Sequence, residues 1–500
     1  MLTPGDVRRF RRWLLLWLPL LSSAWLIAAP PGPDPARAEV EALMASFRLD
    51  SAQVRIQQLA SQPYRAYYQG NLLVYWHLGA QDDPSYHRLA AAWDDLVADL
   101  EAMPKSDAMR GVMLGELMCK RALVEFLHHH YLSAVNFARL GRKHILKNAE
   151  QFPRNLEQNK MLGLFNVVLG AVPSRYQWLT NLLGFVGDLD QGIAQLQQVA
   201  RHGHLLALEA EVILYHVERN ILNQNEQALD RLRQLRARTG NNMLVDYFLA
   251  TGLMSLKHNE AALQVLLRRP HYDDGAVFLL PFWDYQLGKA YSYQGDLARA
   301  KHYLARFVRD YRGNMYRTDA NFRLGMVLTL SGAYPAGRPF FQAVADPQGD
   351  QFDEDDYARH ICEAFARQAP SAALLDLFRA RNYYDGGYFE RAVAVLLGMN
   401  QDRLSPDEQA EWQYRMARVR HTQGHLALAF DHYQRCLDLA VSKPLDYLHA
   451  YACYFQAEIA REWGQTAQAR AAYRQALQYN HYFYQDGLEN RVKAALDGLK

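Results

Sequence analysis

Apolar and polar residues recur with a helical period along most of the chain, and six segments repeat one pattern. In each segment a small residue lies in a first apolar stretch, a turn follows, and a second small residue comes twelve positions after the first. A 3.6-residue period interrupted by a turn predicts two helices folded against each other. The segments are "LATGLMSLKHNEAALQVLL", "LGKAYSYQGDLARAKHYLARF", "LGMVLTLSGAYPAGRPFFQAV", "ARNYYDGGYFERAVAVLL", "MARVRHTQGHLALAFDHYQRCL" and "QAEIAREWGQTAQARAAYRQAL".

Three positions define this repeat. The first small residue is Ala250, Gly288, Gly325, Ala380, Ala417 or Ala457. The second is Ala262, Ala300, Gly337, Ala392, Ala429 or Ala469. A large residue follows four positions later, at Leu266, Leu304, Phe341, Leu396, Tyr433 or Tyr473. Small residues let two helices approach closely and the large one fills the space toward the next unit, so the pattern resembles the tetratricopeptide repeat.

The spacing of the units predicts an all-α solenoid with one insertion. Successive first positions are 38, 37, 55, 37 and 40 residues apart. The longest step contains the acidic run Asp350 to Asp356, which lacks the oxygen spacing of an EF-hand and which we expect to form a solvated loop. Weaker copies extend upstream, where Ala122 and Ala134 keep the twelve-residue step. A solenoid of this kind has a concave groove lined by the first helix of each unit.

Composition agrees with an all-helical fold. The chain has 500 residues, of which 50% are hydrophobic, and is therefore long enough for a sizeable core. Asn-Gly and Asp-Gly turns between alternating runs are nearly absent, so we expect almost no sheet.

The N-terminus reads as a secretory signal peptide over residues 1–38. Basic residues Arg8 to Arg12 precede an apolar run, and an Ala-x-Ala site ends at Ala38. An uncleaved membrane anchor is the alternative. We expect an exported protein of a Gram-negative envelope, periplasmic or envelope-associated. The near-neutral body has no basic stripe for nucleic acid and no polybasic cluster for anionic lipid.

Residues 161–187, "MLGLFNVVLGAVPSRYQWLTNLLGFVG", hold a single charge. Pro173 divides them into two halves, each too short to span a membrane. We expect a buried helical hairpin; a hairpin that lines a pocket for lipid or another apolar ligand is the alternative. The chain is accordingly divided into N-terminal repeats at 39–160, this hairpin at 161–200 and the repeat array at 201–500.

This hairpin resembles the tetratricopeptide repeat protein 39 and inclusion-body clearance protein family. The matching residues are Gly163, Phe165, Pro173, Gly184, Phe185, Gly187, Asp188 and Gly192. The resemblance implies an all-helical, repeat-built adaptor without a known catalytic site, here as a bacterial, exported relative.

Metal, redox and hydrolytic chemistry find little support in the sequence. Cys119, Cys362, Cys436 and Cys453 form no CxxC pair, and whether Cys436 and Cys453 form a disulfide is open. The "HHH" run from His128 to His130 lies at a turn, where consecutive side chains diverge. No HExxH, GxSxG or phosphate-loop pattern occurs. We expect no enzyme, cofactor or metal site; a metal-dependent hydrolase is the contrasting hypothesis.

The groove is the candidate site. Positions on the first helix of three units would face it, and Tyr and Arg are favoured in interfaces. We therefore expect a protein or peptide partner with acidic character, and the alternative is that these tyrosines pack between helices. The candidate residues are Phe282, Tyr285, Lys289, Tyr414, Arg418, His421, Tyr451, Tyr454 and Arg461.

Overall fold

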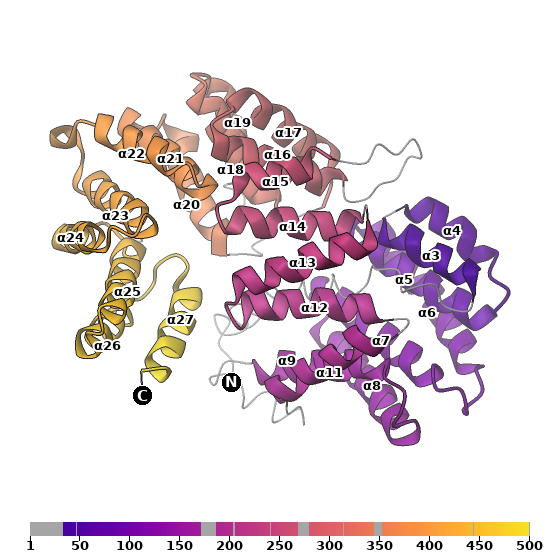
Figure 1. The fold of residues 1–500 in the computed structure, drawn as a ribbon. Helices are drawn as coiled ribbons and strands as arrows, with labels where there is room; N and C mark the ends of the chain where they lie inside the picture. The colour runs from indigo at the N-terminus through magenta and orange to yellow at the C-terminus, as the bar shows by residue number, and fades with distance from the viewer. Residues whose placement is uncertain are drawn as a thin grey trace.

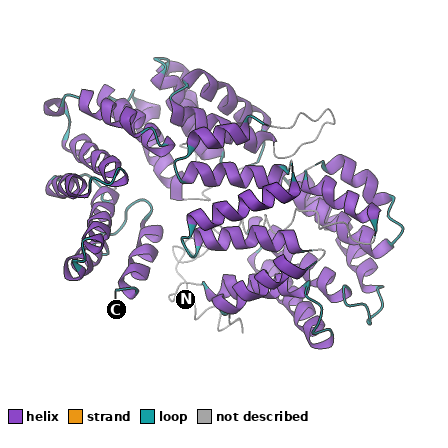
Figure 2. Cartoon of the chain, viewed as in Figure 1, coloured by secondary structure: helices purple, strands orange, loops and turns teal. Residues whose placement is uncertain are grey.

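The computed structural model describes residues 34–499 except 47, 172–186, 204–205, 241, 269–279, 314, 345–352 and 444. These described residues form α-helices joined by short connections and contain no β-strand (Figure 2). The predicted signal peptide lies almost entirely outside them. Within the described part of the chain, no helix is both long and apolar enough to cross a membrane.

The first part of the chain pairs its helices up to residue 220. They are α3 (Pro35–Ala45), α4 (Leu49–Gln57), α5 (Gln62–Ala80), α6 (Asp83–Glu101), α7 (Arg110–Leu127), α8 (Tyr131–Gln151), α9 (Gln158–Gly170), α11 (Leu189–His202) and α12 (Ala207–Asn220).

The middle of the chain continues the stack toward the top of Figure 1. Its helices are α13 (Asn225–Thr239), α14 (Met243–Ser255), α15 (Asn259–Leu266), α16 (Leu280–Gln294), α17 (Leu297–Asp310), α18 (Arg317–Leu330) and α19 (Tyr334–Val344).

The last part of the chain curves away as a separate arc on the left of Figure 1. Its helices are α20 (Asp353–Arg367), α21 (Ala372–Gly386), α22 (Phe389–Gly398), α23 (Pro406–Thr422), α24 (Leu426–Asp438), α25 (Tyr447–Glu462), α26 (Thr466–Ala476) and α27 (Gln485–Asp497), with the short 3-10 turn η1 (Gln401–Arg403) between α22 and α23.

The predicted repeat register is confirmed, because all of its small and large positions are buried. A Cβ added at Gly288 in α16 would lie 2.6 Å from Cγ of Leu304 in α17, so only a residue this small fits. Successive units are also tied by hydrogen bonds. The indole N–H of Trp283 donates to the carbonyl of Leu266 over 2.8 Å, and Trp412 donates to Leu396 over the same distance.

The insertion after α19 contains a helix, and the prediction of a loop is wrong for residues 353–356. They form the first turn of α20, whose buried face includes Tyr357, Cys362 and Phe365. The apolar period downstream drives this helix, and carboxylates are favourable at a helix N-terminus.

The insertion also redirects the solenoid, because α21 packs against α16. Three interhelical turns meet there. A guanidinium N–H of Arg391, just after the α21–α22 turn, donates to the carbonyl of Gln294 over 2.7 Å. A Cβ on Gly387 would lie 2.0 Å from the carbonyl oxygen of Lys257, in the α14–α15 turn. The C-terminal arc is therefore fixed to the centre of the stack.

Candidate functional site

The predicted groove positions separate into two classes. Phe282, Tyr285 and Tyr414 are no more than 5% exposed. Tyr285 stacks on Tyr316 with ring centroids 4.7 Å apart and donates to the Asp319 carboxylate over 2.6 Å. These three rings fill the space between neighbouring helices, where a partner cannot reach them.

Positions one turn further along the same helices reach the inner side of the C-terminal arc. In Figure 1, α23 lies on the inner side of the arc and α24 on the outer side. Arg418 of α23 donates one N–H to the Tyr384 hydroxyl over 2.7 Å and another to Tyr414 over 3.2 Å. Its guanidinium carbon lies 4.0 Å from the ring centroid of Phe455 in α25. Arg418 therefore links α21, α23 and α25.

Tyr384 is the centre of this arrangement. Nζ of Lys257 lies 4.0 Å from its ring centroid, on the side provided by the α14–α15 turn. Although burial alone raises a tyrosine pKa, the charges of Arg418 and Lys257 outweigh it and lower the pKa of Tyr384. The hydroxyl is thus held in a strongly positive environment.

Further charges extend the surface toward α20. The Arg381 guanidinium lies 5.0 Å from the ring centroid of Tyr357 and 3.8 Å from the Asp385 carboxylate. In α23, Arg415 forms an ion pair with Glu411 over 2.7 Å. We call Lys257, Arg381, Tyr384, Asp385, Glu411, Arg415, Arg418 and Phe455 the inner surface.

The inner surface combines aromatic rings with an excess of positive charge. Four of its residues are cationic and two are carboxylates. Cations placed over rings and paired with hydroxyls are partly desolvated, and hydrogen bonds to charged groups are stronger there than in water. This chemistry suits an acidic ligand that also presents aromatic or hydroxyl groups.

The remaining candidates lie at the edge of the inner surface or beyond it. The His421 ring lies 5.7 Å from Phe455, and burial, with help from Arg418, lowers its pKa to about 4. Tyr451 and Tyr454 are half-buried in α25, and Arg461 is exposed and paired with Glu458 over 2.7 Å. Lys289 of α16 lies near Tyr293, 5.9 Å from Nζ to the ring centroid.

Arg381 and Tyr384 are missing from the sequence prediction, yet the register contains them. The positions one and four residues after the first small residue give Arg418 and His421 in the unit of Ala417. Applied to Ala380, the same offsets give Arg381 and Tyr384. Lys257 belongs to a turn of a distant unit, so no local signal indicates it.

The family-specific residues serve close packing and helix capping. A Cβ on Gly163 of α9 would lie 2.8 Å from the carbonyl oxygen of Gly192 in α11, so the two backbones touch. Asp188 caps α11 by accepting from the Gln191 amide over 2.9 Å. A Cβ on Gly187 would lie 2.6 Å from the amide nitrogen of Gly170.

The structure describes only one of the remaining four residues of the family motif. Phe165 packs against the edge of the core. Pro173, Gly184 and Phe185, and with them the second half of the hairpin, lie outside the described residues. The apolar-ligand alternative therefore stays a prediction.

The histidine run does not diverge fully. His129 turns to Tyr131, but the rings of His128 and His130 lie 6.0 Å apart and both contact Tyr86. Across the part of the chain that the structure describes, no group of three or more His, Cys, Asp or Glu residues is arranged to hold an ion.

The thiols of Cys436 and Cys453 are free, which answers the question of a disulfide. Burial raises the pKa of each to about 12, so both are protonated at neutral pH. They pack inside the α24–α25 contact as small apolar side chains.

A buried ion cluster joins α7, α9 and α12. The Lys160 ammonium contacts the carboxylates of Glu116 over 2.9 Å and Glu209 over 2.5 Å, and Lys120 also pairs with Glu116. The two lysines lower the pKa of Glu116 to about 2 despite its burial, whereas burial raises the pKa of Glu209 to about 7. Because these side chains are at most 8% exposed, the cluster serves the interior of the fold.

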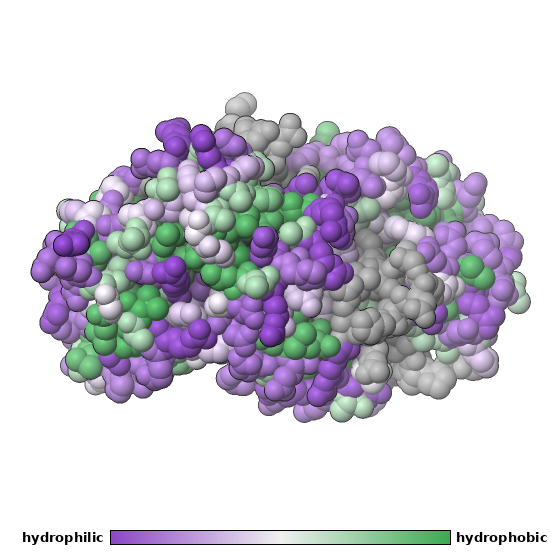
Figure 3. Space-filling model, turned by 90° about the horizontal axis from the view of Figure 1, so that it is seen from above, coloured by the Kyte–Doolittle hydropathy of each residue, from purple (hydrophilic) through white to green (hydrophobic). Residues whose placement is uncertain are grey.

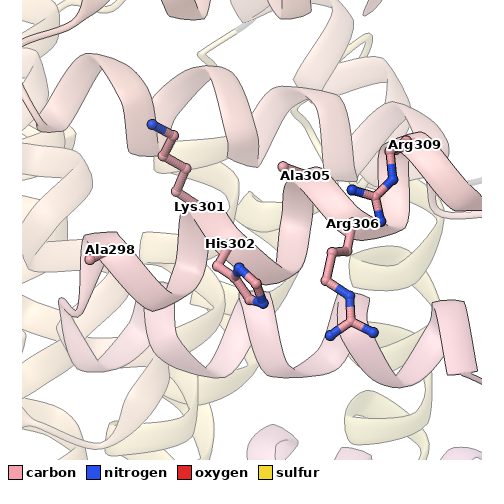
Figure 4. A pocket seen from close by; sticks show the side chains of 6 residues that line it. All are labelled: Ala298, Lys301, His302, Ala305, Arg306 and Arg309. Carbon is pink, nitrogen blue, oxygen red and sulfur yellow. The ribbon is translucent and has the colours of Figure 1, made fainter.

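An open hollow of about 710 Å³ lies along the exposed face of α17. Figure 4 shows Lys301, His302, Arg306 and Arg309 on this helix, with Ala305 among them and Ala298 at one end. Arg306 and Arg309 already face Asp284 and Asp310. On the face seen in Figure 3, apolar patches are scattered among polar residues.

Comparison with known proteins places the chain among helical-repeat proteins. Residues 148–312 match the model of the Iml2/Tetratricopeptide repeat protein 39 family, and residues 450–480 match the tetratricopeptide repeat. No curated protein matches the chain significantly. The crystal structure of the APC/C hetero-tetramer Cut9–Hcn1 aligns over 93% of this chain and 89% of its own, with 12% identity and a TM-score of 0.27, too low to support an argument.

The two matches fall on different parts of the fold. The first covers the glycine contact between α9 and α11 and extends through α17, and the second covers most of α25 and all of α26. Together with the buried register of small and large residues, they show an all-α solenoid with tetratricopeptide-like repeats, part of which matches the Iml2/Tetratricopeptide repeat protein 39 model.

Proposed function

We propose that the protein is a non-enzymatic scaffold that binds an acidic segment of a partner protein on the inner surface. Tetratricopeptide repeats generally serve protein–protein interaction, and the proposal adds the place and the chemistry. The observation that supports it most is Arg418, whose guanidinium is shared between Tyr384 and Phe455.

The charge of the inner surface selects the class of partner. A carboxylate of the partner would meet several cations at once, and arginine binds carboxylates through two parallel hydrogen bonds. The half-buried Phe455 offers aromatic area beside these charges, while Tyr384, only 5% exposed, orients Arg418 through its hydroxyl. Arg415 is already paired with Glu411, and Arg381 and Lys257 share Asp385, so the charge that an acidic segment would compensate is chiefly that of Arg418.

The test begins with peptides selected from a random displayed library on the intact protein. Arg418→Gln should weaken the binding of the selected peptides about tenfold or more, because a hydrogen bond to a charged group contributes roughly 1.5–3 kcal/mol. Fluorescence anisotropy measures the affinity. Melting curves show whether the variant is folded, since Arg418 is half-buried and its removal also loosens α21 and α25.

Arg435→Gln is the matched control. Arg435 lies on α24, on the outer side of the arc, where it is 57% exposed and paired with Asp431. It should leave the affinity unchanged. Equal affinity of wild type and a folded Arg418→Gln variant would contradict the proposal.

We also propose that residues 1–38 direct the chain to the cell envelope. The motivation is the Ala-x-Ala site at Ala38. Mass spectrometry of the N-terminus in the native host would recover a chain that begins near Glu39, whereas an intact N-terminus in the cytoplasm would contradict export.

A further inference from the structure

The connection between α26 and α27 reaches across the arc to α20. Its Phe483 ring lies 5.6 Å from Tyr357 of α20 and 6.4 Å from Tyr447 of α25, between ring centroids. The neighbouring Tyr484 ring lies 6.0 Å from each of the same two tyrosines. Side chains from the end of the chain thus bridge two helices that are distant in sequence.

The two sides of this contact differ in burial. Tyr357 and Tyr447 are only 4% and 5% exposed, whereas Phe483 and Tyr484 are half-buried. The buried pair forms a platform, and the second pair lies on it. Arg381 of the inner surface is 5.0 Å from the Tyr357 ring, so the platform continues the inner surface without a break.

The backbone conformation of the connection also indicates that contacts hold Phe483 and Tyr484 in place. Tyr484 has φ +65°, in the left-handed region that a residue with a bulky side chain rarely adopts. Such a conformation persists where surrounding contacts hold it. The hydroxyl of Tyr451 lies 3.5 Å from the carbonyl oxygen of Tyr484, and His360 borders the Phe483 ring at 5.5 Å.

We propose that Phe483 and Tyr484 occupy the aromatic end of the inner surface as an intramolecular ligand, which a partner with two adjacent aromatic residues displaces. This rests on the proposed function and specifies its partner further, as an acidic segment that contains an aromatic pair. Offset and edge-to-face packing of such rings on Tyr357 and Tyr447 provides the recognition.

An occupant on the same chain competes strongly. A tethered segment acts at an effective concentration in the millimolar range, so a free peptide binds the intact chain weakly. Removal of the two rings without removal of the platform should therefore expose a site for the same segment added in trans.

The experiment uses the full chain with Phe483→Ala and Tyr484→Ala, and a fluorescent peptide of residues 478–487, "QYNHYFYQDG". This variant should bind the peptide at least about tenfold more tightly than wild type does, because the tethered competitor is gone. The control is the same peptide with alanine in place of Phe483 and Tyr484, which should not bind. Equal affinity of wild type and variant, or no binding to a folded variant, overturns the proposal.

A second measurement tests the proposal if the Phe483→Ala and Tyr484→Ala variant does not fold. In the intact chain, Tyr357→Ala should accelerate hydrogen–deuterium exchange at the amides of residues 482–485, and unchanged exchange there overturns the proposal. The two proposals can fail separately. If the peptide does not bind in trans while library-selected peptides still depend on Arg418, only the intramolecular occupant is refuted.

Discussion

Arg418 shows why single residues of a repeat protein are hard to classify from sequence. Its position on the first helix is the one that faces the groove, and the sequence suggests an exposed charge. In the structure its guanidinium is enclosed by Tyr384, Tyr414 and Phe455. Two of these partners come from the units directly before and after its own, which a local pattern does not contain.

Tyr414 and Tyr384 have different roles because their contacts also depend on residues of other helices. Tyr414 packs against Tyr433 of α24, inside its own unit, while Tyr384 at the later offset meets Arg418. The two positions are seven residues apart in the repeat register, about two helical turns, so they share a face of the first helix and differ in their place along its axis. The predicted set of groove residues mixed these two kinds of position.

The contact between His77 and His128 predicts a loss of stability in acid. Their Nε2 atoms lie 3.0 Å apart, so one ring donates its N–H to the other, and charge on both rings at once is unfavourable. Burial, with the nearby His128, lowers the pKa of His77 to about 4. A histidine whose pKa is lower in the folded state stabilises the fold above its unfolded pKa, and this stability is lost as the pH falls from about 6.5 toward 4.

Melting temperatures between pH 7 and pH 4.5 measure this effect. Wild type should lose stability over that interval, by about 1–3 kcal/mol from this site, and His77→Gln should lose less because it cannot be protonated. His425→Gln, at an exposed position before α24, should follow wild type. Identical pH profiles for wild type and His77→Gln would contradict this account.

At the scale of elements, small residues decide which helices touch. The repeat register was readable from the sequence because Ala and Gly recur at a fixed offset, and the burial of all these positions confirms it. The glycine contact of α9 and α11 was likewise visible in the family motif, although its structural reason appears only in the close approach of Gly163 and Gly192.

The sequence does not predict the contact between the α21–α22 and α14–α15 turns, and substitution of Gly387 tests it. Gly387 has φ +83°, and an added Cβ would lie 2.0 Å from the Lys257 carbonyl oxygen. Gly424 has φ +78° with nothing within 4 Å of an added Cβ. Alanine at either position costs about 1–2 kcal/mol for the left-handed backbone.

Gly387→Ala should therefore destabilise the fold more than Gly424→Ala does. The difference, about 1–3 kcal/mol as for other overpacked sites, reports the contact between the α21–α22 and α14–α15 turns. Denaturant unfolding of the two variants measures it. Equal destabilisation would show that the C-terminal arc does not rest on this turn.

At the scale of the whole molecule, the sequence predicts the class of fold but not its path. Helical period, turn positions and the small-residue register lead directly to an all-α solenoid. The repeat spacing shows that an insertion lies around α20, but it does not predict that α21 packs on α16. That packing depends on contacts between residues about 90 positions apart. That packing brings Lys257 next to Tyr384 and so completes the inner surface.

The most direct test of the binding face is hydrogen–deuterium exchange of the intact protein with and without a library-selected acidic peptide. The account predicts slower exchange in α21, α23 and α25, with α24 and the α9–α11 pair unchanged, and faster exchange in the α26–α27 connection where the peptide displaces its aromatic rings. Protection confined to α9 and α11, or to the outer helices α22, α24 and α26, would contradict the assignment of the inner surface as the binding site.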